Sequence, residues 1–115
     1  METKLINLLP HPLVLLGPTG AILLHQEPDG PAARCAEDRR EVGALTLPGG
    51  ATVPLRALGF GEVTNLPAPR VGVLYVVSRP VAETASWRDD LVYPDEVIRD
   101  ADGHPLGCRA LARAA

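Results

Sequence analysis

The chain has 115 residues, a net charge of −3 and a hydrophobic content of 46%. This length predicts a single domain covering residues 1–115, because typical domains contain about 100–150 residues. The acidic balance argues against nucleic-acid binding, which needs a basic face to contact phosphates. No apolar run of about 18 residues is present, so we expect no membrane-spanning helix.

The amino-terminal segment does not resemble a secretion signal. Residues 5–14 are mostly apolar but contain two prolines, whereas a signal peptide has an uninterrupted apolar region that follows a basic stretch. We therefore expect a cytoplasmic protein. In a reducing compartment, Cys35 and Cys108 are expected to remain two buried thiols rather than one disulfide.

Short Val- and Leu-rich runs alternate with breaks containing Pro and Gly in the first half of the chain, a pattern typical of strands joined by turns. Gly17-Pro18-Thr19-Gly20 and Pro48-Gly49-Gly50-Ala51 predict hairpin turns. Pro54 has no amide hydrogen, so its strand should lie at a sheet edge. The strands expected here are 5–9, 13–16, 21–25, 32–42 (ending near 38–40), 45–47 and 52–55.

In the second half, residues 73–77 form the most apolar run and predict a central strand buried on both faces. Ser78 and Pro80 suit the first turn of a short helix over residues 79–87. The remaining expected elements are a bulged strand at 59–63 and closing segments at 91–93, 96–99 and 105–109 around a turn at 100–103. The predicted fold is α+β and mainly antiparallel β, a small barrel or sandwich with one short helix.

The chain carries short motifs at residues 6–12, 61–63 with 66–67, 75–78, 81–82, 88–90, 99–103 and 107–108. Together these motifs are similar to those of one family. Leu9 and Phe60 depart from its pattern, which has threonine and tyrosine there, so hydroxyl-dependent roles are not expected at these positions. The family comprises small, uncharacterised bacterial and phage proteins that open with Asn-Leu-Thr-Pro-His. The resemblance implies one compact bacterial or phage-type domain and brings no activity, cofactor or catalytic residue.

The densest group of polar and charged residues follows the most apolar predicted strand. Ser78 and Arg79 stand at the start of the predicted helix, where free amides attract phosphate or carboxylate. Arg88 and Arg99 are placed to add bidentate contacts. The simpler alternative is that Ser78 only caps the helix while the arginines pair with nearby aspartates. The functional hypothesis is a non-catalytic binding module that recognises a small anionic ligand or a protein partner at this junction.

His11 joins the tentative ligand-binding set, because a proline on each side restricts its backbone and holds the ring in one direction. The alternative is a histidine hydrogen-bonded to the backbone at a strand end. A second functional hypothesis is a small hydrolase or transferase that uses His11 with Cys108, or with the carboxylate of Asp89, Asp90 or Asp95. Binding is the preferred hypothesis, because no spacing of residues matches a catalytic motif.

Neither a metal nor a cofactor is expected. Asp100-x-Asp102-Gly103 begins like a calcium loop, but the following residues supply no further oxygen ligands, so the segment is interpreted as a turn. The histidines and cysteines lack the spacing of a zinc site. A second copy of the chain is an expected partner, because a β protein with exposed strand edges often pairs them in a homodimer.

Overall fold

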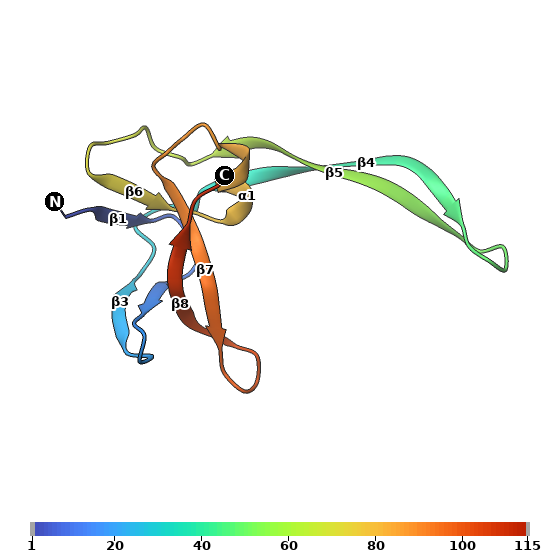
Figure 1. Ribbon diagram of the computed structural model, residues 1–115. Coiled ribbons are helices and arrows are strands. Elements are labelled where there is room, and N and C mark those ends of the chain that lie inside the picture. The colour runs from blue at the N-terminus through green and yellow to red at the C-terminus, as the bar shows by residue number, and fades with distance from the viewer. Residues whose placement is uncertain (1, 115) are drawn as a thin grey trace.

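The computed structural model describes residues 2–114 and consists of a body and one long arm (Figure 1). The body holds a six-stranded sheet with the strand order β1-β6-β7-β8-β2-β3, and the arm is a separate two-stranded hairpin of β4 and β5. The elements are β1 (Lys4–Asn7), β2 (Leu13–Leu16), β3 (Ile22–Gln26), β4 (Arg34–Thr46), β5 (Thr52–Thr64), β6 (Val73–Val76), α1 (Arg79–Thr84), β7 (Leu91–Arg99) and β8 (Pro105–Ala112).

The predicted mainly β fold with one short helix is confirmed, but the sheet is not closed into a barrel and no sandwich is formed by the described residues. β1 and β3 stand at the two ends of the open sheet. The pairing is also more mixed than expected, because β1–β6, β6–β7 and β2–β8 are parallel. The helix ends at Thr84 rather than at residue 87. No helix within residues 2–114 has the length and apolar character needed to cross a membrane.

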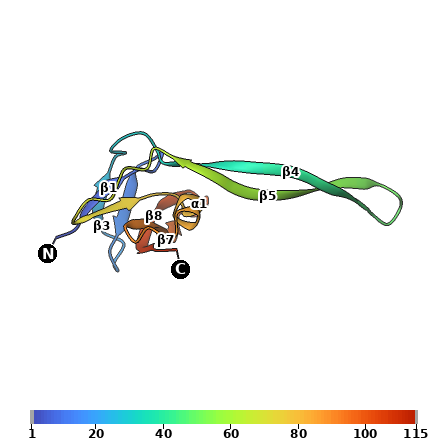
Figure 2. The same cartoon turned by 90° about the horizontal axis from the view of Figure 1, so that it is seen from above.

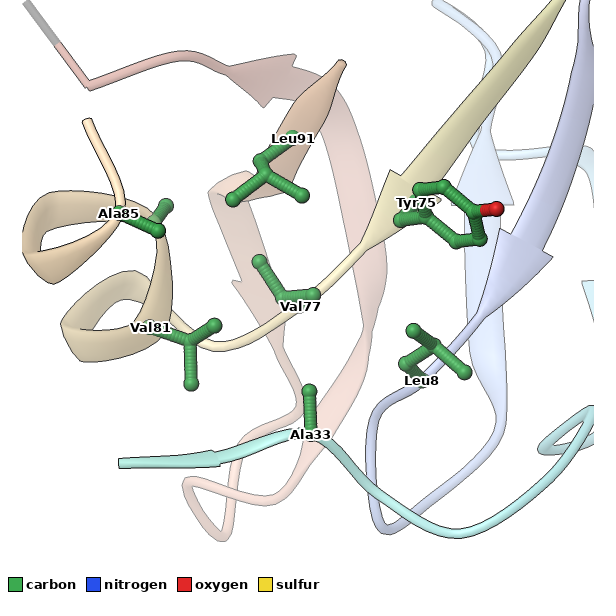
Figure 3. Close-up of a cluster of buried hydrophobic side chains, with 8 residues drawn as sticks. Leu8, Ala33, Tyr75, Val77, Val81, Ala85 and Leu91 are labelled. Carbon is green, nitrogen blue, oxygen red and sulfur yellow. The ribbon is translucent and has the colours of Figure 1, made fainter. Parts of the chain in front are cut away.

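Side chains on both faces of the sheet form the core of the body. Tyr75 and Val77 belong to one buried cluster and Val76 to the other, because successive side chains of a strand point to opposite faces. The prediction that this strand is buried on both faces is therefore confirmed for its carboxyl end. On the first face, Val81 of α1 and Ala85, the residue that follows α1, pack against the sheet (Figure 3).

The arm is longer than any strand predicted from the sequence. The expected strands at 32–42 and 45–47 are one continuous β4, and those at 52–55 and 59–63 are one continuous β5. The two strands are paired along their whole length, from Arg34–Thr64 to Thr46–Thr52. The register shifts at two places, between Cys35 and Glu37 and between Glu41 and Gly43. The expected end of the first strand near residues 38–40 is wrong, because the charged residues there remain paired with β5.

The length of the arm sets the dimensions of the molecule. Each arm strand has 13 residues and therefore spans about 43 Å. The radius of gyration is 18.1 Å, whereas a compact chain of this length would have about 13 Å. Both views show the arm leaving the body and ending far from it (Figures 1 and 2).

Contacts at the base of the arm fix it to the body. The buried Ala33 donates its backbone N–H to the carbonyl of Leu8 at 3.0 Å. Cys35 Sγ lies 3.3 Å from Thr84 Oγ1 of α1, and Cys35 and Val63 both pack against the core beneath the helix. Beyond these residues the side chains of both arm strands are exposed.

Candidate functional site

Ser78 and Arg79 lie beside each other at the start of the helix, as predicted. The Arg79 side chain is paired with a carboxylate of the protein, and the Ser78 side chain does not cap the helix. α1 has only six residues, and the Ser78 side chain makes no capping hydrogen bond. Arg79 Nε donates to Glu83 Oε1 at 2.8 Å, and its guanidinium lies 5.8 Å from the centre of the Tyr93 ring. The pKa of Arg79 is raised, chiefly by the hydrogen bond to Glu83.

Arg88 forms a bidentate ion pair with Asp90. Its Nε and Nη2 atoms each lie 2.7 Å from a carboxylate oxygen, and both side chains are largely buried. Arg88 Nη2 also donates to the carbonyl of Pro67 at 2.9 Å. The hydrogen bonds from Arg88 lower the pKa of Asp90. This pair therefore joins the loop around Pro67 to the start of β7, and the donors of Arg88 are directed at protein acceptors.

Arg99 lies at the opposite end of β7 from Arg88, roughly 25 Å or more along the strand. Its Nη1 atom donates to the carbonyl of Gly103 at 3.0 Å. Asp100 Oδ1 accepts hydrogen bonds from the backbone N–H groups of Asp102 and His104, both at 2.9 Å. Ligand atoms of Asp100, Asp102 and His104 lie within 4.8 Å of one another on the exposed surface, and these backbone bonds are those of the predicted turn.

A cleft of about 390 Å³ opens in the body between the β2–β3 and β7–β8 hairpins. The two hairpins separate because β2 and β8 pair only at Leu15–Cys108. Gly107 permits this one close approach, since a Cβ atom there would lie 2.9 Å from Val14 O and from Leu16 Cγ. The cleft, hereafter the body cleft, is lined by Leu9, His11, Pro12, Leu13, Val14, His25, Pro94, Val97, Pro105, Leu106, Gly107 and Cys108.

The body cleft brings His11 and Cys108 to one site. His11 Nδ1 lies 2.9 Å from the carbonyl of Pro12, and Cys108 Sγ donates to the carbonyl of Val14 at 3.7 Å. No hydrogen bond between His11 and Cys108 is present among the described residues. Burial raises the pKa of the Cys108 thiol. The predicted free thiols are confirmed, although Cys35 is only half-buried.

The outer part of the arm has a composition that differs from the rest of the chain. No charged residue occurs between Glu41 and Arg56, and we define residues 42–55 as the arm tip. Leu45 lies directly opposite Val53 across the hairpin. The large apolar side chains of the tip are 40–53% exposed, and they are Val42, Leu45, Leu47, Val53 and Leu55.

The inner part of the arm, defined as the stalk, consists of residues 34–41 and 56–64. It carries four arginines and four acidic residues and is therefore neutral. Glu41 faces Arg56 across the strands at the boundary with the tip. Arg39 also forms an exposed ion pair with Glu37 at 3.3 Å. The arm thus divides into a charged but neutral stalk and an uncharged tip.

No known protein family, curated protein or solved structure matches this chain. The resemblance to small bacterial and phage proteins remains a prediction. The fold and its surfaces are therefore the basis for any functional conclusion.

The exposed apolar arm tip is a candidate interaction surface that no sequence motif indicates. Its signal was present as an uncharged run in which leucine and valine alternate with small residues on both sides of Pro48-Gly49-Gly50. This pattern predicts a hairpin. It does not reveal whether the apolar side chains face a core, since burial depends on what packs against the hairpin.

Proposed function

We propose that this protein is an interaction module whose arm tip docks on a protein partner. One observation carries the proposal: five large aliphatic side chains, with no charge among them, are exposed at the end of a hairpin that leaves the body. Exposed apolar groups that gather in one patch mark interaction surfaces more often than scattered ones do.

The energetics of the hairpin support a covered tip. A two-stranded hairpin without a third strand or a helix behind it is at best marginally stable in water. Full burial of a Val or Leu side chain stabilises by about 1.5–3 kcal/mol, and the five tip residues are about half exposed. A partner that covers these side chains would supply much of the burial free energy that is not gained while they are exposed. It would also order the arm.

The charge distribution favours a protein partner over other classes. The stalk carries equal numbers of positive and negative residues, the tip carries none and the whole chain has a net charge of −3. A nucleic-acid partner would require a basic arm. An uncharged aliphatic surface fits an apolar protein groove, in which a charged group would be costly to desolvate.

The proposal is tested by photo-crosslinking of the full chain in the cells that produce it. A photoreactive residue replaces Leu45 at the tip. In the control protein the same residue replaces Val71, which is fully exposed on the body. We expect a discrete protein adduct from position 45 that position 71 does not give. Equal labelling at the two positions, or no protein adduct from position 45, would overturn the proposal.

A second candidate function is catalysis by a small hydrolase or transferase, and it is favoured by the shared position of His11 and Cys108 in the body cleft. The raised pKa of Cys108 opposes it, because the thiolate is the nucleophile. Hydrolysis of activated esters by the purified chain, lost in Cys108→Ser and in His11→Ala, would support this candidate. No turnover above the two variants would exclude it.

Recognition of a small anion at Ser78 and the neighbouring arginines has less support than docking by the arm. Arg79 and Arg88 are each occupied by a carboxylate, so an anion would have to displace Glu83 or Asp90. A thermal shift with phosphate and organic anions tests it. A ligand at 100 times its dissociation constant should stabilise the chain by about 2.7 kcal/mol, and no shift in the melting temperature would exclude it.

A further inference from the structure

We propose that the partner of the arm tip is a second copy of this chain, and that the tip of each copy occupies the body cleft of the other. This inference rests on the proposed function, because it names the partner and the surface on which the arm docks. It makes the protein a dimer held together by reciprocal exchange of arms.

The body cleft matches the tip in chemistry. Its walls are built mainly from leucine, valine and proline, and none of its lining residues is Asp, Glu, Lys or Arg. Val97 and Leu106 line it, and both are large apolar residues that remain about half exposed. The molecule therefore carries an uncharged apolar projection and an uncharged apolar recess.

The tip and the cleft of one copy lie on separate parts of the molecule. Contacts of Ala33 with Leu8 and of Cys35 with Thr84 fix the base of the arm to the body. The rest of the arm then extends for most of its length of about 43 Å away from the body (Figures 1 and 2). A tip seated in a body cleft must therefore come from another molecule.

The area of contact favours a reciprocal dimer over a single docking event. The tip strands are about 23 Å long and about 10 Å wide, so one face covers about 250 Å². One docked tip then buries about 500 Å² on both partners together, which is below the range of specific interfaces. Two reciprocal contacts reach about 1,000 Å², the area that separates biological interfaces from smaller, poorly packed contacts. In a two-fold dimer both contacts form between the same two molecules. No tip or cleft is then left free to bind a third copy.

The charges of the stalk are compatible with a self-pairing arrangement. Its four positive and four negative residues cancel, so two arms that pass close to each other would not repel through a net charge of one sign. An arm adapted to a strongly acidic or basic partner would carry the opposite charge in excess.

The experiment measures the association of the purified full chain by analytical ultracentrifugation. We expect a species of twice the 12.2 kDa chain mass. Leu45→Asp at the tip and Leu106→Asp at the cleft should each weaken dimerisation by about tenfold or more, because each places a carboxylate in the apolar contact. Leu58→Asp, on the stalk and similarly exposed, is the matched control and should change the dissociation constant by less than about twofold.

Mixing the two damaged variants separates this arrangement from other dimers. In an equimolar mixture of Leu45→Asp and Leu106→Asp, a mixed dimer keeps one contact between a native tip and a native cleft. We therefore expect the mixture to dimerise more tightly than either variant alone. In a dimer formed by pairing arm with arm, Leu106→Asp would have no effect and mixing would restore nothing.

A monomer at about 100 µM, or a dimer that Leu106→Asp leaves unchanged, would overturn the inference. If the purified chain is a monomer while position 45 still crosslinks to a different protein in cells, the inference fails and the proposed function stands. If position 45 gives no protein adduct at all, the proposed function itself fails. Circular dichroism of the three variants confirms that each remains folded before the association constants are compared.

Discussion

Asn7 is a fully buried amide whose hydrogen bonds hold together the turn beside the body cleft. Its Nδ2 donates to the carbonyls of His11 and Gln26 at 3.1 and 3.0 Å, and its Oδ1 accepts the backbone N–H of Leu9 at 2.9 Å. These bonds join the end of β1 to the turn that carries His11 and to the end of β3. Asn7 thereby positions one wall of the cleft.

Replacement of this amide should destabilise the whole body. In Asn7→Ala the backbone groups of Leu9, His11 and Gln26 lose their partner, and we expect the free energy of unfolding to fall by roughly 2–4 kcal/mol in a urea titration. Asn65→Gly is the matched control, since Asn65 is exposed, has a positive φ of 61° that glycine tolerates and makes one hydrogen bond. A loss below about 0.5 kcal/mol in Asn7→Ala would show that the amide has no such role.

The pair of Arg88 and Asp90 predicts a pH dependence of stability. The pKa of Asp90 is lower in the folded chain than in the unfolded chain, so folding favours the carboxylate. Its contribution is complete above the ordinary carboxyl pKa of about 4 and is lost as the pH falls through the lower folded value. Asp90→Asn should cost about 1–3 kcal/mol at pH 7, and this difference from the native chain should shrink below pH 4.

Urea titrations at pH 7 and near pH 3 measure this effect. Asp89→Asn is the control, because Asp89 is the exposed neighbour of Asp90, and it should change stability by less than about 0.5 kcal/mol at either pH. A difference between Asp90→Asn and the native chain that is as large near pH 3 as at pH 7 would contradict the assignment.

At the scale of elements, the contact between β8 and β2 decides whether the cleft exists. The two strands meet at one registered pair, Leu15–Cys108, and diverge from there into separate hairpins (Figure 1). Gly107 stands at this meeting point without a side chain that would hold the strands apart. The sequence predicts the first of these hairpins and the turn of the second, but it does not indicate that β2 and β8 lie beside each other in parallel.

Adding a methyl group at Gly107, where β8 meets β2, should destabilise the protein. In Gly107→Ala the new Cβ would meet backbone and side-chain atoms at about 2.9 Å, and we expect a loss of about 1–3 kcal/mol. Gly59→Ala is the control in another strand, because its Cβ meets nothing within 4 Å, and its unfolding free energy should change by less than about 0.5 kcal/mol. Equal melting temperatures for the two variants would contradict the close approach of β8 to β2.

At the scale of the whole molecule, the core and the arm are built on different residues. The core clusters draw on every strand of the body and on α1, while the arm strands themselves contribute the partly buried Cys35 and Val63. The body should therefore fold without most of the arm. The arm, by contrast, depends on its base for alignment and on a partner for the burial of its tip.

Shortening of the arm tests this independence. Replacement of residues 38–59 by Asn-Gly keeps the Glu37–Phe60 pair and closes the hairpin with a favoured two-residue turn. We expect the melting temperature, measured at low protein concentration, to remain within about 5 °C of the native chain. A fall of more than about 10 °C would show that the arm contributes to the stability of the body.

Local chemistry alone determined a large part of this protein. The turns at Gly17–Gly20, Leu47–Gly50 and Asp100–Gly103, the short helix after Ser78 and the buried strand at residues 73–76 all follow from Pro and Gly positions and from apolar runs. These features act over a few residues, so a single sequence contains their cause.

Only the tertiary structure decided which apolar runs form the core. Residues 42–55 and 73–77 are both apolar, yet the first lie exposed on the arm tip and the second lie inside the body. The same applies to charge, because Arg88 and Arg99 are near in sequence and stand at opposite ends of β7. The physical reason is that burial depends on contacts between segments distant in the chain, and periodicity within a segment does not specify its neighbour.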